Sequence, residues 1–498
     1  MTQGPRVRTT EGVVEGRWRS GLAEFRGISF AEPPVGKLRF AAPAPPARWE
    51  GTRRATDFGP PPPQSGPVQV ESARDPDWLT LNVCTPDLGA AGLPVLVWIP
   101  GGAYITAVSS DPMYDPARLC EAGLVVVSLN YRVGVEGFAL LDGAPPNRGL
   151  LDQIAALEWV QRNIGRFGGD PAQVTVAGQS AGAGSIAALL TMRRARGLFR
   201  RAITHSVPGS HCTPALAERV AATLANRLGT SPTAAALSDV DPWRLADELT
   251  ALNADLPADR KQWARLAQVG VAVCPVIDGE VLSETPWSAL TGGRASGAEL
   301  LIGHTRDEFR LFTVMAGRMG TFTDHDARTA LDLFAPQPHG ADAYRAAHQR
   351  ATPEELLETV YSDALFRMPS LHLAEANAVA GGTSFLFELC LAAPASGGVL
   401  GACHSIDVPL AFGTLDSPTG RQMFGDLPGP EAVRVSHELQ QAWTRFVATG
   451  DAGWVAHRPD QRLTRVLDTE SKTVPYPEEV SRRIWENHTP APFDLETT

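Results

Sequence analysis

The sequence contains no long hydrophobic run, no excess of basic residues and few cysteines. No apolar stretch reaches the roughly 18 residues that a membrane-spanning helix requires, and the first residues, Met1 to Arg6, lack the apolar segment of a secretory signal. The formal net charge of -11 opposes binding to nucleic acid and to anionic membranes. We therefore expect a cytoplasmic protein that binds neither nucleic acid nor a membrane.

The six cysteines are scattered, with no C-x-x-C pair and no histidine cluster at zinc-binding spacing. In a reducing compartment such cysteines are expected to remain thiols, so we do not expect a disulfide framework. The sequence likewise predicts no metal and no organic cofactor. The cysteines are Cys84, Cys120, Cys212, Cys274, Cys390 and Cys403.

The length of 498 residues alone would favour about three domains. The chain nevertheless contains no internal repeat and no linker long enough to divide it. Two Ala- and Leu-rich stretches with helical spacing, at about 213–268 and 325–380, interrupt segments that have the pattern of strands. We therefore predict one domain, 1–498, in which these two stretches are helical insertions that cover a sheet.

Continuous apolar runs at 94–99 and 124–129 are typical of parallel strands that are buried on both faces. A segment with helical spacing follows at 150–160, and further strands are expected at 300–302 and 384–387. Strands that alternate with helices in this way predict an α/β fold with a central, mostly parallel sheet.

The most informative segment is Gly178-Gln179-Ser180-Ala181-Gly182. It follows the β-branched run 174–176 and precedes small residues with helical spacing at 183–190, so the serine lies at a turn between a strand and a helix. G-x-S-x-G in this setting is the nucleophile elbow of the α/β-hydrolase fold, in which the serine hydroxyl is exposed above the sheet. The pattern predicts Ser180 as a nucleophile.

A serine nucleophile needs a histidine to take its proton and a carboxylate to hold that histidine. In α/β-hydrolases both follow the serine, the acid first and the histidine second. Asp307 and Glu308 both follow a predicted strand, and the local sequence does not choose between them. His404 lies further on, in the loop 401–410, although the chain has 11 histidines and position alone does not select it.

The reaction also needs backbone N–H groups that bind the oxyanion of the tetrahedral intermediate. The residue after the nucleophile, Ala181, is expected to supply one of them. Gly101 and Gly102 directly follow the strand that ends at Ile99 and are expected to supply the others, because glycine lets the backbone approach the substrate closely.

Many segments, taken in order, resemble the type-B carboxylesterase family, and the resemblance covers nearly the whole chain. It implies an α/β-hydrolase fold with helical cap insertions and no cofactor. It also selects Glu308 over Asp307 as the acid and supports His404, whose loop resembles the H-x-x-D/E-[LIV]-P segment of the family. The same matching implies the oxyanion role of Gly101, Gly102 and Ala181. The segments that carry the resemblance are 25–36, 79–83, 130–134, 147–153, 167–171, 275–279, 442–446 and 449–451.

The chain departs from this family at several positions. Pro100 stands where the family usually has histidine before the two glycines, but this position is not expected to donate an N–H. Pro62 and Trp78 stand where secreted members have two disulfide-bonded cysteines, which agrees with a reducing compartment. Val207 replaces the usual glycine after Ser206, a change that we expect to reshape the acyl pocket.

Gln179 is the departure closest to the nucleophile, because the family usually has glutamate before the serine. The loss of this negative charge predicts less support for a protonated His404, since a nearby anion favours imidazolium. The G-Q-S elbow and the histidine loop also resemble a subset of the family that cleaves carbamates.

These observations predict a serine carboxylesterase that forms an acyl-enzyme through Ser180, His404 and Glu308. A hydrolase of aryl carbamates or anilides that uses the same residues is the alternative. A non-catalytic binding protein is disfavoured, because all three residues are present. The expected partner is a small ester or carbamate, bound by a monomer or weak dimer. The predicted pocket residues are Tyr104, Phe138, Gln179, Phe309, Phe312 and Phe412.

Overall fold

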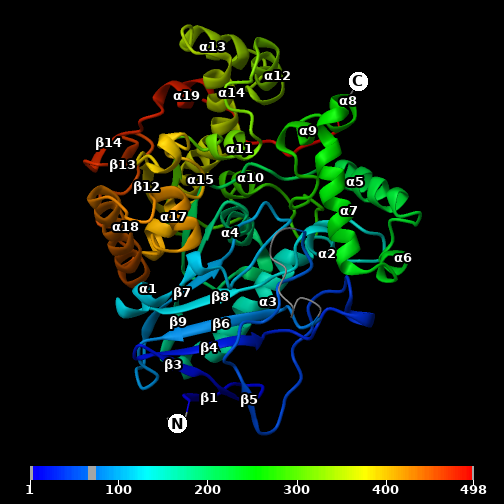
Figure 1. Ribbon diagram of the computed structural model, residues 1–498, viewed down its shortest axis with the longest axis vertical. Helices are drawn as coiled ribbons and strands as arrows, with labels where there is room; N and C mark the ends of the chain where they lie inside the picture. The colour runs from blue at the N-terminus through cyan, green and yellow to red at the C-terminus, as the bar shows by residue number, and fades with distance from the viewer. Residues whose placement is uncertain (1–3, 66–74, 496–498) are drawn as a thin grey trace.

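A large, mostly parallel sheet forms the centre of the protein. The structure, a computed structural model, describes residues 4–65 and 75–495. The sheet has 11 strands in the order β14-β13-β12-β11-β10-β9-β7-β8-β6-β4-β3 (Figure 1). Neighbouring strands are parallel from β8 across to β13 and antiparallel at both edges. The parallel strands are β7 (Leu93–Ile99), β8 (Val125–Leu129), β9 (Gly169–Gln179), β10 (Arg201–His205), β11 (Glu299–Thr305), β12 (Thr383–Leu389) and β13 (Leu463–Leu467).

The other strands form the edges of this sheet and a small second sheet near the N-terminus. The second sheet has three strands, in the order β1-β2-β5. These outer strands are β1 (Arg6–Arg8), β2 (Val13–Glu15), β3 (Arg17–Arg19), β4 (Leu22–Ser29), β5 (Thr52–Arg54), β6 (Thr80–Thr85) and β14 (Lys472–Pro475).

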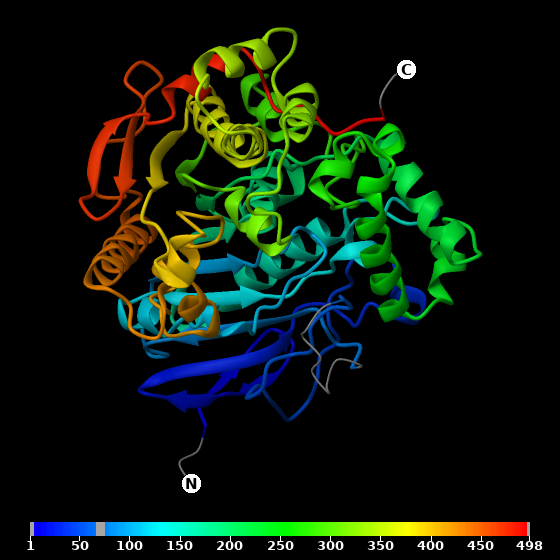
Figure 2. The ribbon, with the colours of Figure 1, turned by 45° about the horizontal axis from the view of Figure 1, so that its top comes forward.

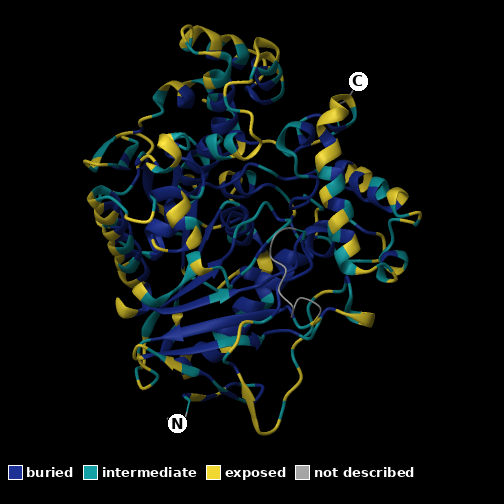
Figure 3. Ribbon diagram, in the orientation of Figure 1, coloured by how far each residue is buried: buried dark blue, intermediate teal, exposed yellow. Residues whose placement is uncertain are grey.

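The two apolar runs predicted as buried parallel strands are confirmed as β7 and β8, which pair with each other. Alternate side chains of β7 enter two separate hydrophobic cores. Val95 and Val97 lie in one core, whereas Leu96 and Trp98 lie in the other. Figure 3 shows the sheet as a buried layer inside the molecule. A strand that is apolar at every position therefore has both faces covered, as its sequence requires.

Helices supply both covers (Figure 2). α3 and α4, together with α10 and α15, pack on one face, and α1, α16 and α18 pack on the other. The predicted α/β architecture is thus confirmed, including the helix expected at 150–160. The bounds are α1 (Ala117–Glu121), α3 (Arg148–Asn163), α4 (Ala181–Thr191), α10 (Pro286–Thr291), α15 (Met368–Val379), α16 (Asp407–Phe412) and α18 (Pro430–Thr449).

The two stretches predicted as insertions consist mainly of helices, at the right and the top of Figure 1. Thr213, Thr323 and Thr352 cap three of these helices, because each hydroxyl accepts a hydrogen bond from a backbone N–H of the first turn. The helices are α5 (Pro214–Arg227), α6 (Ala234–Ser238), α7 (Pro242–Asp255), α8 (Arg260–Trp263), α9 (Leu266–Val269), α12 (Asp324–Phe334), α13 (Gly340–Ala347) and α14 (Pro353–Ser362).

The remaining helices are short and lie in the connections. A π-helical turn, Asp363–Arg367, joins α14 to α15, and such turns are frequent at functional sites. Within 4–65 and 75–495 no helix is long and apolar enough to cross a membrane. The short helices are α2 (Gly134–Phe138), α11 (Arg310–Met315), α17 (Pro418–Phe424) and α19 (Glu479–Ile484).

Candidate active site

Ser180 lies at a sharp turn between β9 and α4, as the elbow sequence predicts. Its backbone is in an unfavourable region for a residue with a side chain (φ 55°, ψ −126°), a strain of roughly 1–3 kcal/mol. A Cβ on Gly178 would lie 2.7 Å from the carbonyl carbon of Gly182, and one on Gly182 would lie 2.1 Å from the oxygen of Ile99. Both glycines are therefore required by close packing, and they hold the turn in shape.

His404 and Glu308 form a buried pair behind this serine. Nδ1 of His404 lies 2.5 Å from Oε2 of Glu308. The other carboxylate oxygen of Glu308 accepts hydrogen bonds from the Ser206 hydroxyl (2.6 Å) and from the N–H of Thr305 (2.8 Å). Burial raises the pKa of Glu308, but the charge of His404 and these hydrogen bonds outweigh it and leave the pKa below its usual value. An ionised Glu308 accepts a hydrogen bond from Nδ1–H of His404, so Nε2 carries the lone pair of the neutral ring.

Asp307, the other acid that the sequence allows, has a different position. Its Oδ2 accepts a hydrogen bond from the N–H of Ala402 (2.8 Å) and another from Arg306 (2.9 Å). Its own N–H donates to the carbonyl of Ala402 (2.9 Å). Asp307 therefore fixes the backbone of the loop that carries His404, while Glu308 contacts the imidazole ring itself.

A second buried histidine–acid pair lies nearby but has no serine. Nδ1 of His205 is 2.6 Å from Oδ2 of Asp407. Its Nε2 accepts a hydrogen bond from the indole N–H of Trp443 (3.1 Å), so both ring nitrogens are engaged. The backbone carbonyl of His205 accepts the N–H of Ser180 (2.9 Å). His205 thus supports the elbow structurally and is not placed to act as its base.

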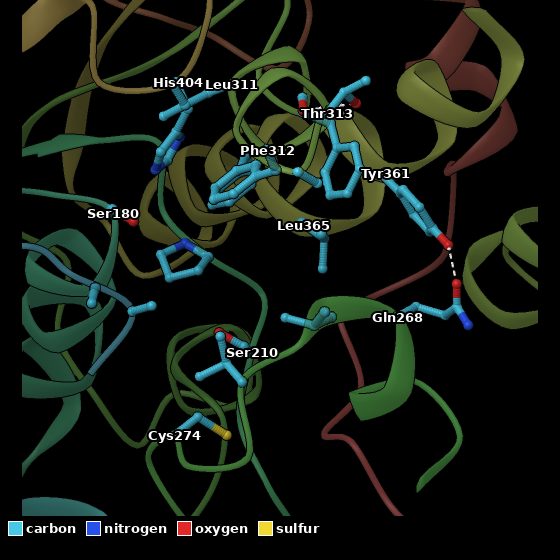
Figure 4. Close-up of a pocket in the computed structure, with 18 of the residues that line it drawn as sticks. Ser180, Ser210, Gln268, Cys274, Leu311, Phe312, Thr313, Tyr361, Leu365 and His404 are labelled. Carbon is cyan, nitrogen blue, oxygen red and sulfur yellow. Dashed lines mark hydrogen bonds between the residues drawn. The ribbon is translucent and has the colours of Figure 1, made fainter. Parts of the chain in front are cut away.

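Nε2 of His404 is hydrogen-bonded to the side chain of Gln179. The side-chain nitrogen of Gln179 lies 3.0 Å from Nε2 of His404, and an amide N–H can donate to the lone pair there. Figure 4 shows the His404 ring beside Ser180 at one side of a cavity. Gln179, the residue before Ser180, therefore contacts His404 directly, a contact that the sequence analysis did not foresee.

The backbone around Ser180 contains the three predicted oxyanion residues and also Ala103. Gly102 and Ala181 line the cavity at Ser180, but Gly101 does not, and Ala103 lines it instead. Gly101 lines an adjoining cavity together with Gly102 and Gln179. A Cβ on Gly101 would meet the backbone oxygen of Gln179 at 2.6 Å, so Gly101 packs closely against the elbow. Ala103, which the sequence analysis did not name, thus lies beside Ser180 with Gly102 and Ala181, and the oxyanion role of Gly101 stays a prediction.

The cavity at Ser180 has a volume of about 570 Å³ and is mainly apolar. Four of the predicted pocket residues line it: Tyr104, Gln179, Phe309 and Phe312. Both helical stretches contribute to its walls. On the side away from Ser180, the hydroxyl of Tyr361 in α14 donates to the side-chain oxygen of Gln268 in α9 (2.9 Å; Figure 4).

Two predicted pocket residues, Phe138 and Phe412, do not line this cavity. Phe138 packs edge-on against Tyr104, with ring centroids 5.0 Å apart, and so lies behind the wall. Phe412 packs against Trp98 and Trp443 in the hydrophobic core of the other sheet face. These two predictions are wrong because an aromatic side chain near a motif can fill a core as readily as a pocket.

Phe366 is a site residue that the sequence analysis missed. Its ring centroid lies 4.4 Å from that of His404, and the ring of Phe312 lies 5.4 Å from His404. Phe366 belongs to the π-helical turn, more than a hundred residues after the elbow, and no local motif points to it. Within the described part of the chain, no group of three or more His, Cys, Asp or Glu residues is arranged to hold a metal.

An elbow serine beside a buried histidine–glutamate pair, on a mostly parallel sheet, defines a serine hydrolase of the α/β class. The Carboxylesterase family model matches residues 3–475, and the chain belongs to this family. Its fold is the α/β-hydrolase fold, and it is a carboxylic ester hydrolase.

Named relatives agree with this assignment over almost the full length. The para-nitrobenzyl esterase of Bacillus subtilis is 35% identical over 96% of this chain and 97% of its own. The phenmedipham hydrolase of Pseudarthrobacter oxydans is 34% identical over 95% of this chain and 97% of its own. The crystal structure of the Geobacillus stearothermophilus carboxylesterase EST55 superimposes with a TM-score of 0.85 at 31% identity, over 96% of this chain and 99% of that one.

Proposed function

We propose that this serine carboxylesterase uses Ser180 as nucleophile, His404 as general base and Glu308 as the group that orients the base. The observation that carries the proposal is the 2.5 Å contact between Nδ1 of His404 and Oε2 of the fully buried Glu308, behind the elbow serine. This contact fixes the tautomer in which Nε2 can accept a proton.

In the first half of the reaction, the Ser180 oxygen attacks the carbonyl carbon while Nε2 of His404 takes its proton. The carbonyl oxygen becomes an oxyanion, and we assign its donors to the backbone N–H groups of Gly102, Ala103 and Ala181, which line the cavity beside the serine. The C–O bond of the ester then breaks, and the imidazolium gives its proton to the leaving alcohol. The product is an acyl-enzyme on Ser180.

In the second half, water takes the place of the alcohol. His404 accepts a proton from this water, whose oxygen attacks the acyl carbon, and the same backbone groups bind the second oxyanion. The bond to Ser180 breaks, the serine regains its proton from His404, and the carboxylic acid leaves. No step requires a metal or an organic cofactor.

The cavity favours substrates with a large apolar or aromatic part. Most of its lining surface is apolar, and Phe309, Phe312 and Phe366 line the space next to His404. A volume of about 570 Å³ is within the range that holds drug-sized molecules. We therefore propose esters with a bulky apolar acyl or alcohol group as substrates.

Aryl carbamates are the second candidate substrate class, since a carbamate ester presents the same carbonyl–oxygen bond to Ser180. The observation that favours this candidate is the 34% identity to phenmedipham hydrolase. A panel of para-nitrophenyl esters of rising acyl length, with a matched para-nitrophenyl carbamate, tests both. The ester proposal predicts a higher kcat/KM for an ester than for the carbamate, and the reverse order would favour the second candidate.

We further propose that the chain, residues 1–498, is one domain with helical insertions. It acts as a monomer or weak dimer in the cytoplasm and takes small molecules alone as partners. The support is the net charge of -11, which opposes nucleic acids and anionic membranes. Light scattering over a range of concentrations tests the oligomeric state: a tetramer or larger assembly would contradict it.

A further inference from the structure

Two cysteine side chains meet beneath the substrate cavity, at a place that the reaction above does not use. The Sγ atoms of Cys212 and Cys274, two free cysteines, lie 2.6 Å apart, well inside ordinary van der Waals contact. Both residues are almost fully buried (1% and 3% exposed). We propose that Cys212 and Cys274 are a redox site, which a peroxide converts from two thiols to a disulfide and a dithiol converts back.

The backbone holds both cysteines in place, so their proximity is a property of the fold. The N–H of Cys212 donates to the carbonyl of Pro275 (2.9 Å), next to Cys274 in the chain, and Cys212 forms a parallel bridge with Val276. The side chain of Asn147 fixes Val276 in turn, since it donates to its carbonyl and accepts from its N–H, both at 2.8 Å. Two segments anchored in this way can be cross-linked without a large backbone movement.

The pair stands at the two ends of the first helical insertion. Cys212 directly precedes Thr213, the residue that caps α5, and Cys274 follows α9. A disulfide would therefore close a loop that contains α5 to α9 and no other α-helix. Because α9 contributes Gln268 to the cavity wall, the bond would also tie that wall to the body of the protein.

The cavity gives an oxidant access to one of the two sulfurs. Cys274 lines the cavity and Figure 4 shows it next to Ser210, whereas Cys212 lies behind it. A peroxide small enough to enter the cavity would react at Cys274. Its O–O bond breaks, the Cys274 thiolate becomes a sulfenic acid, and hydroxide leaves. The Cys212 sulfur then attacks that sulfur, and the second oxygen leaves as water. With hydrogen peroxide, two thiols and one peroxide give one disulfide and two waters.

Burial makes this reaction slow at neutral pH. It raises the pKa of the Cys274 thiol well above the ordinary value, and the contact with Cys212 raises it further. Since the thiolate is the reactive form, disulfide formation should accelerate as the pH rises. The same burial would protect the bond, once formed, from reductants too large for the cavity.

The test is a thiol count on the full-length protein before and after hydrogen peroxide. Each sample is denatured and alkylated with N-ethylmaleimide, and its intact mass is measured by mass spectrometry. The protein is then digested and its peptides are mapped. We expect the reduced protein to carry six alkyl groups, one for each cysteine, and the oxidised protein two fewer, with a cross-linked peptide that joins Cys212 to Cys274. The thermal midpoint of the oxidised protein should rise by about 4 °C, because the cross-link restricts the unfolded chain.

Serine variants supply the controls. Cys212→Ser and Cys274→Ser should each abolish the cross-link and the thermal shift, whereas Cys390→Ser, a substitution outside the pair, should keep both. The proposal is wrong if peroxide leaves all six thiols free, if the bond joins other cysteines, or if Cys212→Ser oxidises as the wild type does. Should a pair variant fail to fold, the peptide map of the wild type decides alone.

Discussion

The side-chain amide of Gln179 lies 3.0 Å from Nε2 of His404, the nitrogen to which we assign the proton of Ser180. Because Nδ1 of His404 is held by Glu308, the amide donates its hydrogen bond to the lone pair of Nε2. Gln179 and Ser180 therefore compete for the same nitrogen. The amide occupies the base in the free protein without adding a charge, and it must give way when Ser180 attacks.

Gln179→Glu should move the pH dependence of the enzyme. A carboxylate at this position would favour the protonated form of His404, so the base would lose its proton only at higher pH. We expect the acidic limb of the kcat/KM profile to shift upward by about one pH unit. The matched control is Gln268→Glu, at the other side of the same cavity (Figure 4), which should shift the limb much less. Equal shifts would show that the contact with His404 is not the cause.

Glu308→Gln and Asp307→Asn separate the two acids that the sequence left open. Glu308→Gln removes the charge that holds His404, and we expect kcat to fall by about 10³-fold or more. Asp307→Asn weakens the contacts to Ala402 and Arg306, so it should lower the free energy of unfolding by about 1–2 kcal/mol and reduce kcat far less. Steady-state kinetics of both variants measures kcat, and urea unfolding measures the free energy of unfolding. The reverse order of kcat losses would make Asp307 the acid.

Gly102→Ala should damage the oxyanion site. The φ of Gly102 is 125°, and an added Cβ would lie 2.2 Å from the backbone oxygen of Thr106, so the segment would have to shift. We expect kcat to fall by about 10²- to 10³-fold with a smaller change in KM. Gly36→Ala is the control, because Gly36 also has a positive φ (55°) but open space around it. It should cost stability only, and a similar loss of kcat there would argue against a local effect.

His211→Phe should make the protein less sensitive to acid. Burial lowers the pKa of His211 to about 4, whereas an unfolded histidine titrates near 6.5. As the pH falls from about 6.5 towards 4, the unfolded state binds a proton that the folded state rejects, so stability is lost in this window. The thermal midpoint of His211→Phe, relative to wild type, should therefore rise as the pH is lowered from 7.5 to 5. The control is His325→Gln, at an exposed position. A difference in thermal midpoint between His211→Phe and wild type that stays constant with pH would refute the prediction.

Ser180 could be predicted from a local motif, whereas the choice of Glu308 over Asp307 and of His404 among the histidines depended on the family resemblance. Ser180 follows β9, Glu308 follows β11, and the loop of His404 comes after β12. In a parallel sheet such ends lie together, so strand order predicts where a common site lies, but it does not choose between neighbouring acids. In the structure His404 contacts Glu308, whereas Asp307 hydrogen-bonds to the backbone of the loop that carries His404.

The residues that sequence reasoning missed depend on how distant segments cross. Ala103 lines the cavity at Ser180, with a positive φ that a two-glycine motif does not predict for the residue after it. Phe366 reaches His404 from a helical turn with no motif of its own. Phe412 fills a core instead of the pocket, since hydrophobicity alone does not distinguish the two. The nearness of Cys212 to Cys274 likewise follows from strand pairing, which scattered cysteines do not reveal.

The most direct test of the account is to label the nucleophile. The protein is incubated with an organophosphate, hydrolysis of a para-nitrophenyl ester is followed, and the digested protein is mapped by mass spectrometry. We predict one covalent adduct, on the peptide that carries Ser180, formed in proportion to the activity lost. Ser180→Ala should have no esterase activity and take up no label, yet unfold at a midpoint close to that of the wild type. A label on another residue, or a Ser180→Ala variant that still turns over the ester, would contradict the account.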